Sequence, residues 1–111
     1  MKTLTGLTEQ IRDKRGDPII FNGRAKPTLT DLFMDIVNKS MHPDPKDVRL
    51  LDKVTDKMIE AEWNGGVLKL EDYEFELIKT SIQQVNVPWG LMIFARRAID
   101  EAEVVDGETI E

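Results

Sequence analysis

The sequence contains no cysteine, and among its 111 residues there is one histidine, His42. Without cysteine the chain can form no disulfide, no thiolate metal site and no cysteine nucleophile. Because His42 is the sole histidine, the sequence lacks the second histidine of a common metal site or hydrolase active site. We therefore interpret His42 as an exposed loop residue. We expect a protein that is not an enzyme and that has no catalytic residues, cofactor or metal.

Long hydrophobic runs are also missing. No apolar stretch approaches the roughly 18 residues that a membrane span needs, so we expect a cytoplasmic protein that does not engage membranes. The last 12 residues lack Lys and Arg and hold six acids, and the other 15 acids balance the 15 bases, so these six equal the whole net charge of −6. Residues 104–111 have too few apolar side chains to fold alone, and we predict a mobile acidic tail there.

What the sequence does contain is helical periodicity. Apolar residues recur at intervals of three and four, which predicts four amphipathic helices at about 28–39, 44–63, 71–85 and 88–102. Thr28 with Asp31 resembles a capping box, and Asp44 followed by Pro45 is a strong signal for a helix start. The helix at 71–85 is the expected centre of the packing, with Phe75, Ile78, Ile82 and Val85 on one stripe. The sequence thus predicts one mainly α (α+β) domain over residues 1–103, a four-helix bundle.

Residues 1–27 allow two interpretations. Asp13 and Gly16 suit the first and fourth positions of a tight turn, and the flanking residues 10–12 and 19–21 would then be short strands of a β-hairpin. The alternative is a short helix over residues 5–15 that ends at Gly16. We favour the hairpin, because Ile-Ile-Phe after Gly-Asp-Pro is typical of a strand.

The many carboxylates do not form a recognisable site. Helical di-iron proteins use a Glu-x-x-His pair, which the sequence lacks. Asp44-Pro45-Lys46 is the nearest match to a magnesium nuclease motif, but Asp44 is better explained as an N-cap. The acids at the start of the 71–85 helix, including Glu74, favour the positive helix end and are expected to face water.

Five residues are candidates for binding a partner. Trp63 and Trp89 each lie at a predicted helix end beside a glycine, and we favour packing at the edge of the core over exposure as interface anchors. Arg96 and Arg97 form either a solvated face or a pairing site for acidic helices. Ile93 and Phe94 are about 100° apart around the last helix, so the two side chains cannot both lie at the centre of one narrow helix–helix interface. We expect the N-terminal hairpin to cover this region, which favours a monomer.

The layout of the chain resembles that of many small bacteriophage-encoded proteins. The resemblance consists of a Gly-turn hairpin (Ile11–Ile19), a Thr-Leu-x-Asp helix (Thr28–Leu32) and a Glu-x-x-Leu-Ile-Lys helix (Glu74–Lys79). It implies a non-enzymatic accessory of phage assembly or a binder of host machinery, located in the host cytoplasm. It implies no functional residue, because these proteins share no site motif.

Three functions are therefore open. The first is a protein-binding accessory module whose partner is a host or phage protein. The second is a regulatory protein that binds nucleic acid through residues 12–26, since residues 1–27 hold six bases and three acids. The third is an acidic mimic of nucleic acid, which is the weakest because residues 1–99 have no net charge. We favour protein binding over nucleic-acid binding, because the chain as a whole is acidic and lacks an Arg- and aromatic-rich face.

Overall fold

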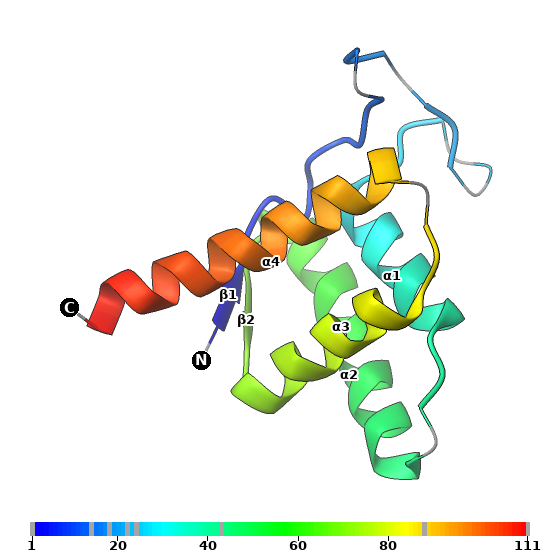
Figure 1. Ribbon diagram of the computed structural model, residues 1–111. Helices are drawn as coiled ribbons and strands as arrows, with labels where there is room; N and C mark the ends of the chain where they lie inside the picture. The colour runs from blue at the N-terminus through cyan, green and yellow to red at the C-terminus, as the bar shows by residue number, and fades with distance from the viewer. Residues whose placement is uncertain are drawn as a thin grey trace.

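The computed structural model describes residues 2–13, 15–17, 19–21, 23, 25–42, 44–87 and 89–110, without the side chains of 104–110. In chain order, the elements are β1 (Lys2–Leu4), α1 (Leu29–Lys39), α2 (Pro45–Trp63), β2 (Leu68–Leu70), α3 (Asp72–Gln84) and α4 (Trp89–Ile110). Four helices with a small antiparallel β element confirm the predicted fold class. The long α4 crosses the other elements, as Figure 1 shows.

The predicted signals for helix starts are confirmed. The Thr28 N–H donates to the Asp31 carboxylate at 2.8 Å, which is one half of a capping box. The Asp44 carboxylate accepts from the backbone N–H of Lys46 at 2.9 Å, with Pro45 at the first helical position. These contacts satisfy N–H groups that have no partner inside the helix, and they fix where α1 and α2 begin.

The strands lie elsewhere than the sequence suggested. β1 pairs with β2, with Lys2 opposite Leu70 and Leu4 opposite Leu68. The turn forms as predicted, with the Gly16 N–H donating to the Asp13 carbonyl at 2.9 Å. Within residues 10–12 and 19–21 only Gln10, Arg12 and Phe21 form single bridges and neither range is a strand, and the alternative helix over 5–15 is also absent from the described residues.

The physical reason is that the segment before the turn bonds to the approach to α1, and between the two flanks the Asp13 N–H donates to the Asp17 carbonyl at 3.0 Å. The Ile11 N–H donates to the Pro27 carbonyl at 2.8 Å, and the Leu29 N–H donates to the Glu9 carbonyl at 3.0 Å. Leu7 and Ile11 are buried side chains, so this segment is held flat against the core. Figure 1 shows the rest of the N-terminal segment projecting as a loop beyond α1.

The core is formed by the predicted stripes of all four helices together with the N-terminal segment. Phe75 and Ile78 of α3 are fully buried, but α1 is the helix that packs substantially against each of the other three, so the expected central position of α3 is wrong. The small residues of the α4 stripe, Ala95, Ala98 and Ala102, are also buried and let β1 approach that helix closely. No helix in the described part of the chain combines the length and the apolar character needed to cross a membrane.

The position of Glu74 and the end of α4 differ from what the sequence predicts. Glu74 does not face water: it is buried, and its carboxylate accepts from the Glu71 N–H at 2.9 Å and from Lys57 Nζ at 3.1 Å. The expectation failed because the capping contact turns this side chain inward towards α2.

The helix α4 extends to Ile110 instead of ending near Ala102. The mobile acidic tail at 104–111 lies outside the described side chains and stays a prediction.

Candidate binding pocket

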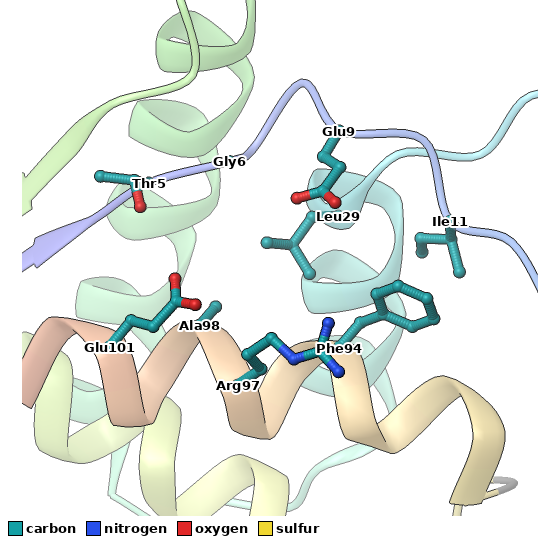
Figure 2. A pocket seen from close by; sticks show the side chains of 9 residues that line it. All are labelled: Thr5, Gly6, Glu9, Ile11, Leu29, Phe94, Arg97, Ala98 and Glu101. Atoms are coloured by element: carbon teal, nitrogen blue, oxygen red, sulfur yellow. The ribbon is translucent and has the colours of Figure 1, made fainter. Parts of the chain in front are cut away.

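The first candidate site is a hollow between α4, the start of α1 and the segment that follows β1. Its volume is about 200 Å³. From α4 it is lined by residues at intervals of i, i+3, i+4 and i+7, which share one helix face. The lining residues are Thr5, Gly6, Glu9, Ile11, Leu29, Phe94, Arg97, Ala98 and Glu101 (Figure 2).

The wall opposite α4 is fixed by a tight turn at Gly6. The Glu9 N–H donates to the Gly6 carbonyl at 2.9 Å, and Gly6 has a positive φ of 75°. Leu7 anchors this turn, because its carbonyl accepts from the buried Thr30 hydroxyl at 3.0 Å and its N–H donates to the Gly66 carbonyl at 3.2 Å. The turn therefore positions Glu9 over the hollow.

Three charged groups border this hollow. Figure 2 shows Glu9 reaching down from the N-terminal segment, while Arg97 and Glu101 rise from α4. All three side chains are exposed, and none of them forms a hydrogen bond or an ion pair within the described part of the chain. The floor between them is apolar, with Ile11, Leu29 and Ala98 buried. The hollow can thus offer one cationic group, two carboxylates and an apolar contact to one ligand.

The five predicted binding residues do not form one site. Phe94 and Arg97 line the hollow, whereas Arg96 borders a different depression beside Lys79 and Glu103. Trp63 is 83% exposed at the end of α2 and Trp89 is 66% exposed at the start of α4. Their exposure agrees with the interpretation as interface anchors and overturns edge-of-core packing.

Trp63 belongs to a second candidate surface on α2. At about 100° per residue, Val48, Ile59 and Trp63 lie within roughly 60° of one another around the helix. Val48 is 53% exposed and Ile59 39% exposed, so these three residues lie on one exposed face of α2, where Asp52 and Thr55 separate Val48 from Ile59 and Trp63. We call this set the α2 stripe. A hollow of about 260 Å³ adjoins its first residue and extends towards the end of α1.

The single histidine is not the exposed loop residue that we expected. His42 is half-buried, and its Nε2 lies 3.1 Å from the Ser40 hydroxyl and 3.0 Å from the Ser81 hydroxyl. Each serine hydroxyl also lies within donating distance of a backbone carbonyl, Ser40 to Val37 at 2.7 Å and Ser81 to Leu77 at 3.0 Å. The expectation failed because two hydroxyls from α3 and the end of α1 offer the ring a polar niche.

The His42 contacts resemble a nucleophile and its base, but their geometry favours a structural tie. Ser81 is fully buried, so a substrate has no access to its hydroxyl. With both hydroxyls donating to carbonyls, the imidazole Nε2–H is the natural donor to the serine oxygens, which is the wrong direction for a general base. The histidine therefore ties the end of α1 to α3. Among the described residues no group of three metal-ligating side chains is close enough to hold an ion.

From the sequence we predicted Phe94 and Arg97, two of the nine residues that line the hollow, but did not place them in one site. The α4 spacing of Phe94, Arg97 and Glu101 is visible in the sequence, but Glu9 joins them through packing between distant parts of the chain. No protein-family model, curated protein or solved structure matches this chain. The function is therefore inferred from the geometry of the hollow beside α4 and of the α2 stripe.

Proposed function

We propose that the protein is a non-enzymatic protein-binding module that holds a basic, amphipathic segment of its partner on the α2 stripe. The observation that carries the proposal is Trp63, which is 83% exposed in line with two other exposed apolar side chains. Tryptophan is enriched among the residues that dominate binding energy at interfaces. Exposed apolar side chains that are aligned on one helix face are typical of a contact with another chain.

Charge supports a basic partner. Asp52 and Asp56 are exposed and lie within or next to the arc of the α2 stripe, whereas Arg49 and Lys53 lie further round the helix. The net charge of −6 equals that of residues 100–111, so the local charges of Asp52 and Asp56 are what favour a basic segment on α2. An apolar stripe with acidic neighbours fits an amphipathic helix whose polar face carries Lys or Arg.

The layout of the sequence supports a narrower proposal, in which the protein is a phage-encoded accessory that acts in assembly or on host machinery. This narrower role rests on the resemblance of the sequence alone. In this role the partner is a phage or host protein, which is compatible with the protein-binding module proposed above.

The test is a titration with two synthetic helical peptides of the same Leu pattern, one with Lys and one with Glu on its polar face. A Trp89→Phe background leaves Trp63 as the fluorescent reporter. The Lys peptide should bind and shift Trp63 emission to the blue as the indole leaves water. In a label-based assay Trp63→Ala should weaken binding about tenfold or more, as expected for a hot spot, whereas Trp89→Ala should have little effect.

Two outcomes would count against this proposal. One is equal affinity for the Lys and Glu peptides, which would remove the charge argument. The other is unchanged affinity in Trp63→Ala, which would remove the stripe from the interface. Thermal unfolding of both tryptophan variants shows whether any loss of binding reflects a loss of folding.

A second candidate is nucleic-acid binding by the loop that projects beyond α1 in Figure 1. Arg12, Arg15 and Lys26 are exposed on it, which supports this function. Arg12 also donates to the Gly16 carbonyl at 3.1 Å, so part of its donor capacity is used within the loop. A titration with short single strands and duplexes at low salt is the test. Binding through this loop should weaken steeply as salt rises, and its absence at low salt would remove this candidate.

A further inference from the structure

The hollow between α4 and the N-terminal segment carries an inference that is independent of the α2 stripe. We propose that it binds a small zwitterion with an apolar side chain, of the size of a free aliphatic amino acid. The ligand carboxylate would bind Arg97, its ammonium group would bind Glu9 and Glu101, and its side chain would lie on the apolar floor. The charges around the hollow, its size and the rigidity of its walls each support this assignment.

The charges select a ligand that carries both signs. Arg97 would attract an anion, but Glu9 and Glu101 line the same space and would repel it. A cation meets the opposite conflict, since it is attracted by the two carboxylates and repelled by the guanidinium. A zwitterion places each of its charges against the opposite sign and can form charge-assisted hydrogen bonds at both ends. Because these three side chains form no ion pair with any other described residue, all of them are able to bind it.

The size and floor of the hollow select a small apolar side chain. Its volume of about 200 Å³ is below the roughly 300–1,000 Å³ that is usual for drug-sized ligands. Ile11, Leu29 and Ala98 form a buried floor, and the half-buried Phe94 ring closes one end, as Figure 2 shows. The floor residues expose little surface, so a branched aliphatic side chain would gain its apolar contact mainly at the half-buried Phe94 ring.

The walls are held in place before any ligand arrives. The N-terminal wall is tied to the loop at Gly66 and to residues 27–30 by backbone contacts of Leu7, Glu9 and Ile11. The opposite wall is the regular helix α4. A preformed site avoids the cost of ordering loops on binding, so a ligand with few atoms can still bind with a Kd on the order of 1 mM.

The experiment uses the full chain and follows backbone amide resonances during titration with four probes. L-leucine carries both charges and the side chain, leucinamide lacks the carboxylate, N-acetyl-leucine lacks the ammonium group, and glycine lacks the side chain. We expect leucine to shift resonances of residues 5–11 and 94–101, and each of the other probes to bind at least about tenfold more weakly, which is the loss of one good interaction.

Neighbouring arginines on α4 provide a matched pair of variants. Arg97→Gln should weaken leucine binding about tenfold and abolish the preference for leucine over leucinamide, because the carboxylate then has no cationic partner. Arg96→Gln, which removes the same charge outside the hollow, should bind leucine as the unmodified chain does. Glu101→Gln should reduce the preference for leucine over N-acetyl-leucine. The amide spectrum of each variant confirms that it is folded.

The same probes separate a free amino acid from the end of a polypeptide. Tighter binding of N-acetyl-leucine than of leucine would show that the site takes a chain carboxyl terminus, and tighter binding of leucinamide would show an amino terminus. Either result would overturn the zwitterion proposal. It is also overturned if leucine shifts no resonance of the hollow, or if Arg96→Gln and Arg97→Gln weaken binding equally.

Discussion

At the scale of single residues, Gly66 shows how closely the loop after α2 approaches the N-terminal segment. Its φ is +80°, and a Cβ placed on it would lie 3.0 Å from the backbone nitrogen of Thr8. Gly65 has a φ of +99° but no atom within 4 Å of such a Cβ. Both positions strain an L-residue, but only Gly66 adds a clash with backbone that is held by the Leu7 contact to Gly66.

We therefore predict that Gly66→Ala lowers the free energy of unfolding by about 2 kcal/mol or more, as strain and overpacking add. Gly65→Ala is the matched control and should cost about 1 kcal/mol, from the positive φ alone. Urea unfolding of both variants measures the difference. Equal losses would mean that the segment at Thr8 moves aside without cost.

A second residue-scale prediction concerns Lys79 and Glu103, which form an ion pair between α3 and α4. The hydrogen bond to the Glu103 carboxylate raises the pKa of Lys79 above its ordinary value of 10.5, and the charges of Glu103, Glu76 and Asp100 act in the same direction. A raised pKa in the folded state stabilises the fold below pH 10.5, and this contribution is lost as pH rises through the folded-state pKa.

Glu103→Gln should therefore lower the pKa of Lys79, followed by NMR titration of its side chain. The difference in unfolding free energy from the unmodified chain should be constant at neutral pH and shrink above pH 10.5. Glu101→Gln removes the same charge two residues away, outside the groups that raise this pKa, and should leave the titration of Lys79 in place. A Lys79 pKa that is unchanged in Glu103→Gln would contradict the ion pair.

At the scale of elements, the sequence predicts whatever depends on neighbours along the chain. The starts of α1 and α2 follow from Thr28, Asp31, Asp44 and Pro45, because caps act within one turn of the helix. The pairing of β1 with β2 has no such signal, since Leu4 and Leu68 are far apart in the sequence and each strand has three residues. Short strands are specified by packing and not by propensity.

The residues of the candidate hollow differ in the same way in whether the sequence alone places them together. Phe94, Arg97 and Glu101 share a helix face by spacing alone, so the sequence places them together. Glu9 reaches them because Leu7 and Ile11 are buried and hold the intervening segment against α1 and α4. The His42 niche was missed for the same reason, because Ser81 comes from a helix that is distant in the sequence.

At the scale of the whole molecule, the question is whether the chain associates with itself through α4. The sequence leaves Ile93 and Phe94 competing for one face, and the structure places them differently: Phe94 is half-buried against the core, whereas Ile93 is 41% exposed. β1 and residues 5–11 cover the α4 face that holds Phe94. The cover comes from this segment; Ile19 and Phe21 of the expected hairpin also pack against the core, whereas Ile20 is 77% exposed.

We therefore predict a monomer, so light scattering at micromolar concentration should give a molar mass near 12.7 kDa. Phe94→Asp should lower the unfolding free energy by at least about 2 kcal/mol, since it replaces a packed ring with a charge in a partly buried place. Glu9 and Glu101 line the same hollow and would repel the new carboxylate, which adds to this loss. Ile93→Asp is the matched control and should cost about 1 kcal/mol or less, because the exposed carboxylate stays hydrated. If the molar mass were instead twice that of the chain, Ile93→Asp should restore the monomer without unfolding it, and α4 would then be the dimer interface.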